Sequence, residues 1–273
     1  MAQTLSQIKS MLHSAGLRPR RRLGQNFLHD ANQMVRILEA AELQARQTVL
    51  EVGPGTGALS ELILEADARL VAVEVDRGLC EILRDRLADH ADCFQLIEGD
   101  VLAGKHALSL EVSTALTAAG PFSLVANLPY AVACPLLVIL FSQWPAMDRA
   151  VAMVQQEVAE RLLASPGGRD FGPLTVMIQA FAHVESIASL PPTCFWPQPQ
   201  VTSTVLRLRR RAQPLTTDPQ GLRALLQRLF SRRRKQIGSI LGRDHPLPEG
   251  VRPDMRPEQL SVEQLIDLSG RLD

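Results

Sequence analysis

The stretch VLEVGPGTGALS, residues 49–60, decides the fold of this 273-residue chain. The apolar run at 48–52 predicts a buried strand, and ALSELILEA at 58–66 predicts a helix. Between them Gly53, Gly55 and Gly57 permit left-handed backbone angles and let the main chain approach a ligand. The order of strand, glycine turn and helix predicts the start of a β-α-β unit with a ligand at the turn. The alternative is a tight turn that binds nothing.

The rest of the chain continues this alternation of strands and helices. Further strands are predicted from short apolar runs at residues 69–75, 93–100, 122–127 and 149–155. Strands alternating with helices favour right-handed crossovers and a mostly parallel sheet. Segments 183–190 and 201–209 flank the loop PPTCFWPQPQ and predict an antiparallel hairpin at the sheet edge. We predict an α/β domain at residues 1–209 and a small all-α domain at residues 210–273.

Composition argues against several classes of protein. The longest apolar run, AVACPLLVILF at 131–141, is too short to span a bilayer, and the N-terminus has no compact apolar segment typical of a signal peptide. Four cysteines and six histidines are dispersed, which argues against a disulfide scaffold or a metal site. We expect a cytoplasmic monomer that has no metal and no membrane partner.

Charge is unevenly distributed although the formal net charge is zero. Residues 207–243 hold eleven arginines and lysines against one acid, Asp218, and RPRRR at 18–22 adds a second basic cluster. A single cluster of this kind is usually a solvated helix face. Two clusters with little acid between them favour a phosphate-binding surface and a nucleic-acid partner.

Acidic residues end the strands that follow the glycine turn. Glu74 ends the second strand, at about the twenty-residue offset where a carboxylate meets ribose hydroxyls. Asp100 ends the third strand, where it could accept from an adenine amino group, and Asp76 is expected to cap the next helix. Ligands bind at the carboxyl ends of strands in such sheets. These residues predict an adenosine-containing cofactor and do not separate NAD from S-adenosylmethionine.

The motif NLPY, residues 127–130, ends the fourth strand on the same edge. Asn127 offers a carbonyl acceptor, Pro129 holds the nearby backbone rigidly, and Tyr130 offers a face on which a base can stack. Accepting hydrogen bonds from an exocyclic amine, by Asn127 and a carbonyl near Leu128, would free the lone pair of that amine for attack on a sulfonium methyl group. The motif therefore favours methyl transfer over hydride transfer. PLLVILFSQ, residues 135–143, predicts the helix that follows.

Six motifs in one order resemble a known family. They are LGQNFL (23–28), VLEVGPGTGALS, VAVEVD (71–76), LIEGD (96–100), VANLPY (125–130) and FSRRRKQIGSIL (230–241). The chain resembles the ribosomal RNA adenine N6-dimethyltransferases, most closely those of the small-subunit (16S) RNA. The resemblance implies a Rossmann-like class I methyltransferase domain with a seven-stranded sheet. It also implies S-adenosylmethionine as the methyl donor, and dimethylation of two adjacent adenosines near the 3′ end of the 16S RNA in a small-subunit precursor.

The resemblance also implies roles for single residues on the cofactor side. Glu74 would hold the ribose, Asp100 and Val101 the adenine, and Asn127 would border the cofactor. The residues that would close the pocket or lie against the methionine portion are Gln25, Asn26, Leu28, Gly53, Gly55 and Gly57.

On the RNA side, Asn127, Leu128, Pro129 and Tyr130 would form the catalytic site for the target base. Phe195 would supply a second stacking face, although a core position is an equal alternative for this ring. The RNA phosphates would be bound by Arg232, Arg233, Arg234 and Lys235. The sequence departs from the family pattern on this side, at Ala131 to Cys134, at Phe171, at Trp196 and at Gln200.

Three other functions compete with this interpretation. A sister enzyme acts on 23S RNA and confers macrolide resistance, and the basic C-terminal segment argues against it. A non-catalytic RNA-binding assembly factor could share the fold, but the intact Asn127, Pro129 and Tyr130 argue against that role. A dehydrogenase shares only the general fold.

Overall fold

The computed structural model describes residues 3–242 and 245–271. Arg243, counted above among the basic residues, lies outside them. The strands are β1 Phe27–Leu28, β2 Thr48–Val52, β3 Arg69–Glu74, β4 Phe94–Glu98, β5 Phe122–Asn127, β6 Met147–Gln155, β7 Ala182–Leu190, β8 Phe195–Trp196 and β9 Ser203–Arg210. The helices are α1 Leu5–Ser14, α2 Ala31–Ala41, α3 Ala58–Glu65, α4 Arg77–Arg86, α5 Leu110–Ala119, α6 Tyr130–Gln143, α7 Gln156–Leu163, α8 Pro173–Gln179, α9 Pro219–Phe230, α10 Ile237–Leu241 and α11 Val262–Ser269.

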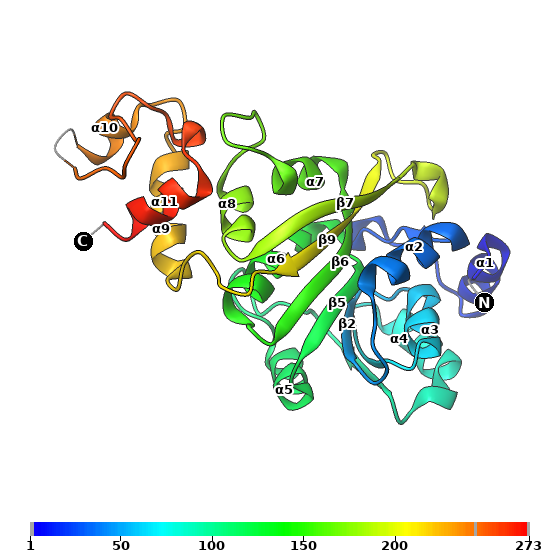
Figure 1. Cartoon of the computed structure of the whole chain (residues 1–273). Coiled ribbons are helices and arrows are strands. Elements are labelled where there is room, and N and C mark those ends of the chain that lie inside the picture. Colours follow the sequence, from blue (N-terminus) through cyan, green and yellow to red (C-terminus); the bar gives the residue numbers. More distant parts are fainter. Residues whose placement is uncertain (1–2, 243–244, 272–273) are drawn as a thin grey trace.

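Seven of the strands form one sheet in the order β4-β3-β2-β5-β6-β9-β7 (Figure 1). Neighbours from β4 to β6 run parallel, whereas β9 pairs antiparallel with both β6 and β7. The order reverses between β2 and β5, and crevices at such a switch point are where ligands bind. The predicted α/β fold, with a mostly parallel sheet and an antiparallel hairpin at its edge, is confirmed.

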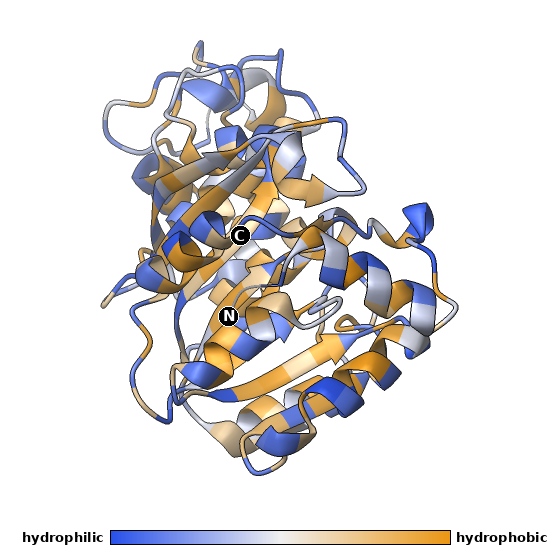
Figure 2. Ribbon diagram, turned by 90° about the vertical axis from the view of Figure 1, so that its right-hand side faces the viewer, coloured by the Kyte–Doolittle hydropathy of each residue, from blue (hydrophilic) through white to orange (hydrophobic). Residues whose placement is uncertain are grey.

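Both faces of the sheet are covered by helices. Val49 packs with α2 and α3 on one face, whereas its neighbour Leu50 packs with α5 and α6 on the other. This alternation is the two-residue period of a strand that is buried on both sides. In Figure 2 the strands are mostly hydrophobic in colour and the helices are mixed, as expected for a layer of helices on each face.

Several elements differ from the sequence prediction. Helix α6 begins at Tyr130 and contains Pro135 in its interior, whereas the prediction started the helix at that proline. Helices α7 and α8 were not predicted. Strands β1 and β8, of two residues each, are too short for a periodic pattern to reveal. The expected cap is confirmed, since the Asp76 carboxylate accepts from the Gly78 amide at 3.1 Å.

The C-terminal region is helical, as predicted. Asp218 caps α9 by accepting from the amides of Gln220 and Gly221. Buried leucines of α9, including Leu222 and Leu226, belong to the same core cluster as α6 and α8. The division of the chain near residue 210 therefore remains a prediction. In the part of the chain that the structure describes, no helix is both long and apolar enough to cross a membrane.

Candidate cofactor and substrate site

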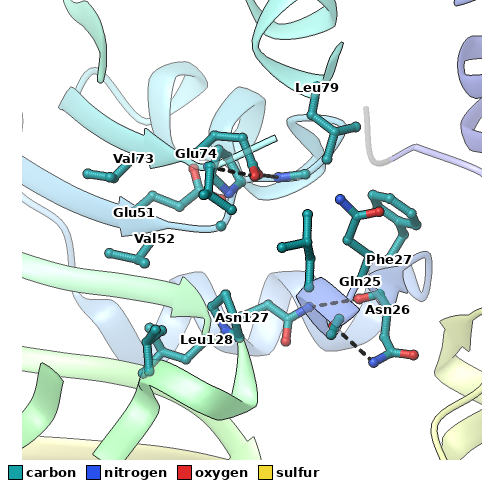
Figure 3. A pocket seen from close by; sticks show the side chains of 18 of the residues that line it. Gln25, Asn26, Phe27, Glu51, Val52, Val73, Glu74, Leu79, Asn127 and Leu128 are labelled. Atoms are coloured by element: carbon teal, nitrogen blue, oxygen red, sulfur yellow. Dashed lines mark hydrogen bonds between the residues drawn. The ribbon is translucent and has the colours of Figure 1, made fainter. Parts of the chain in front are cut away.

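A cavity of about 300 Å³ lies at the carboxyl ends of the central strands. Its walls come from the glycine turn after β2, from the ends of β3 and β5, and from the loop after β4 (Figure 3). A further wall is formed by the segment 22–28, which we call the strap. The volume is at the lower end of the range for small-molecule sites.

The glycine turn packs directly against two other walls of the cavity. Gly53 has a φ of 74°, and a Cβ atom there would lie 2.8 Å from Cγ of Pro129. Gly55 has a φ of 63°, and a Cβ atom there would lie 3.1 Å from the Phe27 ring. A side chain at Gly53 would displace Pro129 of the NLPY motif, and one at Gly55 would require the Phe27 ring to shift by a few tenths of an ångström, so both positions favour glycine sterically as well as conformationally.

Glu74 lies at the end of β3 and is 5% exposed. Its carboxylate accepts from the backbone amides of Gly55 at 3.2 Å, Val75 at 2.9 Å and Asp76 at 2.9 Å. Burial raises the pKa of Glu74, and the three amide donors oppose that shift. The carboxylate is held rigidly toward the cavity and ties the glycine turn to the start of α4.

Three further residues were predicted to contact the cofactor, namely Asp100, Val101 and Gly57. Asp100 and Val101 line the cavity beyond β4, where the Asp100 carboxylate is exposed and accepts from the Leu102 amide at 2.9 Å. Gly57, in contrast, does not line the cavity. It begins α3 with a φ of 83°, and a Cβ atom there would lie 3.0 Å from Leu83 of α4. In this structure Gly57 supports the packing of α3 on α4, and its contact with the ligand stays a prediction.

Glu51 is a cavity residue that the sequence analysis missed. It lies within β2, is 2% exposed, and accepts a hydrogen bond from the Ser60 hydroxyl at 2.6 Å. Burial raises the pKa of Glu51 to about 8, and repulsion by Glu74 adds to the shift. The signal was available, because an acid inside the otherwise apolar run VLEV demands a partner or a function.

Asn127 lies at the end of β5 with its side chain in the cavity (Figure 3). Its Nδ2 donates to the backbone carbonyl of Asn26 in the strap at 3.1 Å. This bond fixes the amide so that Oδ1 remains as an acceptor. Tyr130 lines the cavity as the first residue of α6, and its hydroxyl lies 3.2 Å from Ser203 Oγ.

The strap residues line the cavity, and their polar groups hold the strap in place. Gln25 Nε2 donates to the Asp76 carboxylate at 2.8 Å, and Gln25 Oε1 accepts from the Arg20 amide at 2.7 Å. Asn26 Nδ2 donates to the Gly24 carbonyl at 3.1 Å, and Leu28 is buried in the core beneath the strap. The strap is therefore held in place by the side chains of Gln25, Asn26 and Leu28.

Phe195 does not line the cavity. It is 2% exposed and lies in the core cluster that contains Leu28 and Met34. In this arrangement the ring packs in the core, and its stacking role stays a prediction. The core position was the alternative interpretation of the sequence.

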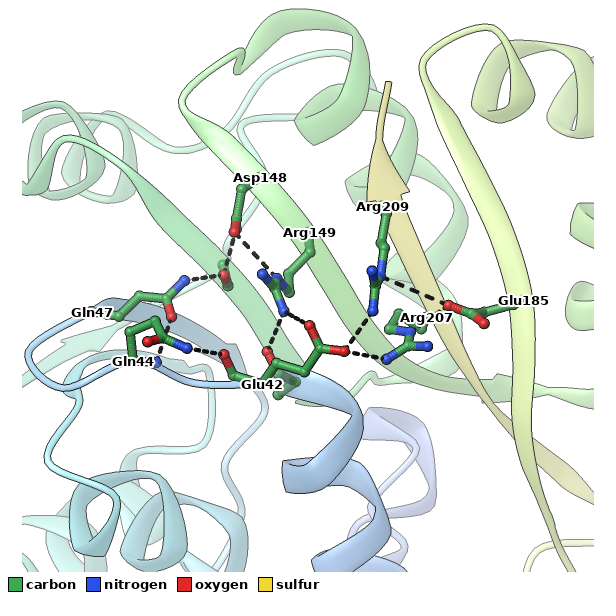
Figure 4. Close-up of polar contacts among 10 residues, drawn as sticks. Glu42, Gln44, Gln47, Asp148, Arg149, Glu185, Arg207 and Arg209 are labelled. Atoms are coloured by element: carbon green, nitrogen blue, oxygen red, sulfur yellow. Dashed lines mark hydrogen bonds and ion pairs between the residues drawn. The ribbon is translucent and has the colours of Figure 1, made fainter. Parts of the chain in front are cut away.

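Arginines of β9 are paired with acids rather than free for phosphate. Arg207, Arg209 and Arg149 surround the Glu42 carboxylate, with N–O distances of 2.7, 2.5 and 2.8 Å (Figure 4). Arg207 also pairs with Glu185. These contacts neutralise Arg207 and Arg209, which the sequence count assigned to a basic surface.

Arg210 also has a structural role. Its guanidinium donates to the carbonyls of Leu140 at 3.0 Å, Phe141 at 2.9 Å and Trp144 at 2.9 Å, at the end of α6. Cations at this position satisfy the last carbonyls of a helix. The predicted basic surface is therefore smaller than the sequence count suggests.

The basic cluster at 232–235 follows α9 and does not line the cavity. Arg233 donates to the Gly168 carbonyl at 3.2 Å and lies 3.8 Å from Glu258. Arg232, Arg234 and Lys235 are exposed and form no ion pair within the described part of the chain. These three remain the candidates for contact with phosphate.

The sheet order and the cavity at its switch point define a Rossmann-like methyltransferase fold, and solved structures share it. A dimethyladenosine transferase from Plasmodium falciparum superposes with a TM-score of 0.74 at 24% identity, covering 89% of this chain and 95% of that one. The 23S rRNA methyltransferase ErmE gives a TM-score of 0.68 at 27% identity, covering 90% and 99% of the two chains.

Residues 16–273 match the family model described as ribosomal RNA adenine dimethylase. A ribosomal RNA small subunit methyltransferase A from Opitutus terrae is 40% identical over 88% of this chain and 85% of its own length. The chain belongs to the ribosomal RNA adenine dimethylase family. The family predicted from the six motifs is confirmed.

Proposed function

We propose that this protein transfers methyl groups from S-adenosylmethionine to N6 of two adjacent adenosines near the 3′ end of small-subunit ribosomal RNA. The observation that carries the proposal is the hydrogen bond from Asn127 to Asn26, which leaves Asn127 Oδ1 as an acceptor in the cavity. An amide oxygen at that place recognises an amine and excludes a carbonyl group.

The walls of the cavity suit S-adenosylmethionine. Glu74 and Asp100 bring two carboxylates to a site whose other walls include Val73 and Leu79. Carboxylates accept from a ribose diol and attract the positive charge of a sulfonium or ammonium group, while apolar side chains cover a flat base. We assign the ribose to Glu74, the adenine to Asp100 and Val101, and the methionine portion to Gly53 and Gly55.

The base side of the site activates the acceptor nitrogen. When bound, S-adenosylmethionine supplies a methyl group on a positively charged sulfur. Asn127 Oδ1 accepts an N–H bond from N6 and holds its lone pair toward that methyl group, and Tyr130 stacks on the ring. Transfer of that methyl group to N6 would leave the donor as a thioether, and the methylated nitrogen would release a proton to water. The proline after Leu128 fixes this geometry, since Pro129 packs on Gly53.

The RNA partner is recognised outside the cavity. Arg232, Arg234 and Lys235 bind phosphates with little sequence information, so the shape of the RNA selects the site. Extruding the adenine from its stack costs free energy, which stacking on Tyr130 partly offsets. We place this reaction on a precursor of the small subunit, with a monomeric enzyme in the cytoplasm.

Three RNA substrates separate the candidate functions. Labelled S-adenosylmethionine is offered with immature small subunits, with large subunits and with protein-free RNA, and the modified nucleosides are mapped. We expect dimethyladenosine at adjacent positions of the small-subunit RNA. Modification of the large-subunit RNA alone would support the 23S enzyme, and binding without methyl transfer would support the assembly factor. The Asn127→Ala variant serves as the control for enzyme-dependent label.

A further inference from the structure

Phe27 forms part of the cavity wall and lies between two surfaces. One of them is the glycine turn, because a Cβ atom on Gly55 would lie 3.1 Å from the Phe27 ring. The other is the indole of Trp196, whose centroid lies 6.4 Å from that of Phe27 with an angle of 26° between the planes. Phe27 is 6% exposed and lines the cavity. Its position therefore depends on Trp196 as well as on the glycine turn.

Trp196 reaches Phe27 because β1 and β8 form a separate two-stranded ladder. Phe27 lies opposite Trp196, and Leu28 lies opposite Phe195. Successive side chains of a strand point to opposite faces, so Phe195 enters the main core while Trp196 faces the strap. The loop 191–202 is therefore anchored in the main core by Phe195 and contacts Phe27 of the cavity wall through Trp196.

A small hydrophobic cluster on this face is separate from the two cores of the sheet. It contains Ile8 and Leu12 of α1, Phe27, and Leu79 of α4, with Trp196 packed at its edge. The indole is also covered by the ammonium group of Lys9, 5.3 Å from the ring centroid. Small clusters of this kind open at lower free energy than a main core does.

We propose that Trp196 is a positioning residue of the methyl-donor cavity, which holds Phe27 against Gly55 and so couples the strap to the loop 191–202. The proposal rests on the assignment of this cavity to S-adenosylmethionine.

Substitution of Trp196 tests the coupling. We expect Trp196→Ala to weaken binding of S-adenosylmethionine about three- to tenfold, the scale of one aromatic pair, with the loss in KM for the donor rather than in kcat. Trp196→Phe retains a ring on Phe27 and should restore most of the affinity. Trp144 is the matched control, because it packs on Phe122 and does not line the cavity, so Trp144→Phe should leave the affinity unchanged.

Tryptophan fluorescence gives a second measurement, since the chain holds only two tryptophans. In the Trp144→Phe protein, emission from Trp196 should change on addition of S-adenosylmethionine, and the Trp196→Phe protein should show no such change. Equal donor affinities of the wild type and Trp196→Ala, or unchanged Trp196 emission while calorimetry records binding, would overturn the proposal and leave the donor assignment intact. Absence of donor binding to the wild type would overturn both.

Discussion

Replacing Glu51 by glutamine should change how the free energy of unfolding depends on pH. Glutamine keeps the shape of the side chain and an oxygen that can accept from Ser60. The pKa of Glu51 rises from its usual 4.5 to about 8 because the carboxyl group is buried. The folded protein therefore holds a proton between these values that the unfolded chain releases.

The sign of the effect follows from that difference in proton binding. The contribution of Glu51 to stability is fully present below about pH 4.5, falls as the pH rises toward 8, and is constant above that value. The slope is about 1.4 kcal/mol per pH unit, and half of the folded molecules have lost the proton at the upper pKa. Between about pH 6 and about pH 8 the free energy of unfolding of the wild type should therefore fall by about 2 kcal/mol relative to that of Glu51→Gln.

Urea denaturation of both proteins at the two pH values measures this change. The difference between the wild type and Glu51→Gln cancels the other titrating groups. Glu42→Gln is the matched control, because hydrogen bonding to Arg149 lowers the pKa of Glu42, so this residue does not titrate between the two pH values. A gap between the wild type and Glu51→Gln that stays constant would show that Glu51 is ionised in the folded protein at neutral pH, contrary to our reasoning.

Three further predictions concern the site and the RNA. Asn127→Ala should abolish methyl transfer with donor affinity nearly unchanged, and residual turnover close to the wild-type rate would disprove its role. Glu74→Gln should weaken binding of S-adenosylmethionine by about 1–3 kcal/mol in calorimetry, the scale of a hydrogen bond to a charged group. Equal affinities of this variant and the wild type would show that Glu74 does not bind the ribose. Glutamine at Arg232, Arg234 and Lys235 should weaken RNA binding and flatten its dependence on salt, whereas an unchanged salt slope would place the basic surface elsewhere.

Residues at the ends of strands were the most predictable part of the molecule. Glu74 and Asn127 could be placed because each directly follows an apolar run, and parallel strands bring their carboxyl ends to one edge. The glycine turn was predictable for a similar reason, since Gly53 and Gly55 lie between a strand and a helix. Local sequence is sufficient where the sheet itself determines which residues meet.

Contacts between distant residues could not be predicted in this way. The ion pairs of Glu42 join it to Arg149, Arg207 and Arg209, and no local pattern shows that these arginines have a partner. The same holds for the ladder between β1 and β8, which determines that Phe195 is buried. Counting charges along the chain therefore overestimated the basic surface.

The NLPY motif alone does not determine the orientation of the Asn127 amide. Within NLPY, either the oxygen or the nitrogen of this side chain could face the acceptor amine, and only the oxygen can accept from it. The choice is made by the Asn26 carbonyl, 101 positions away in the sequence, through a bond of 3.1 Å. Because Asn26 belongs to the strap that also lines the donor cavity, the same segment that covers the donor orients the group that receives the base. The chemistry assigned to NLPY therefore depends on the strap being closed.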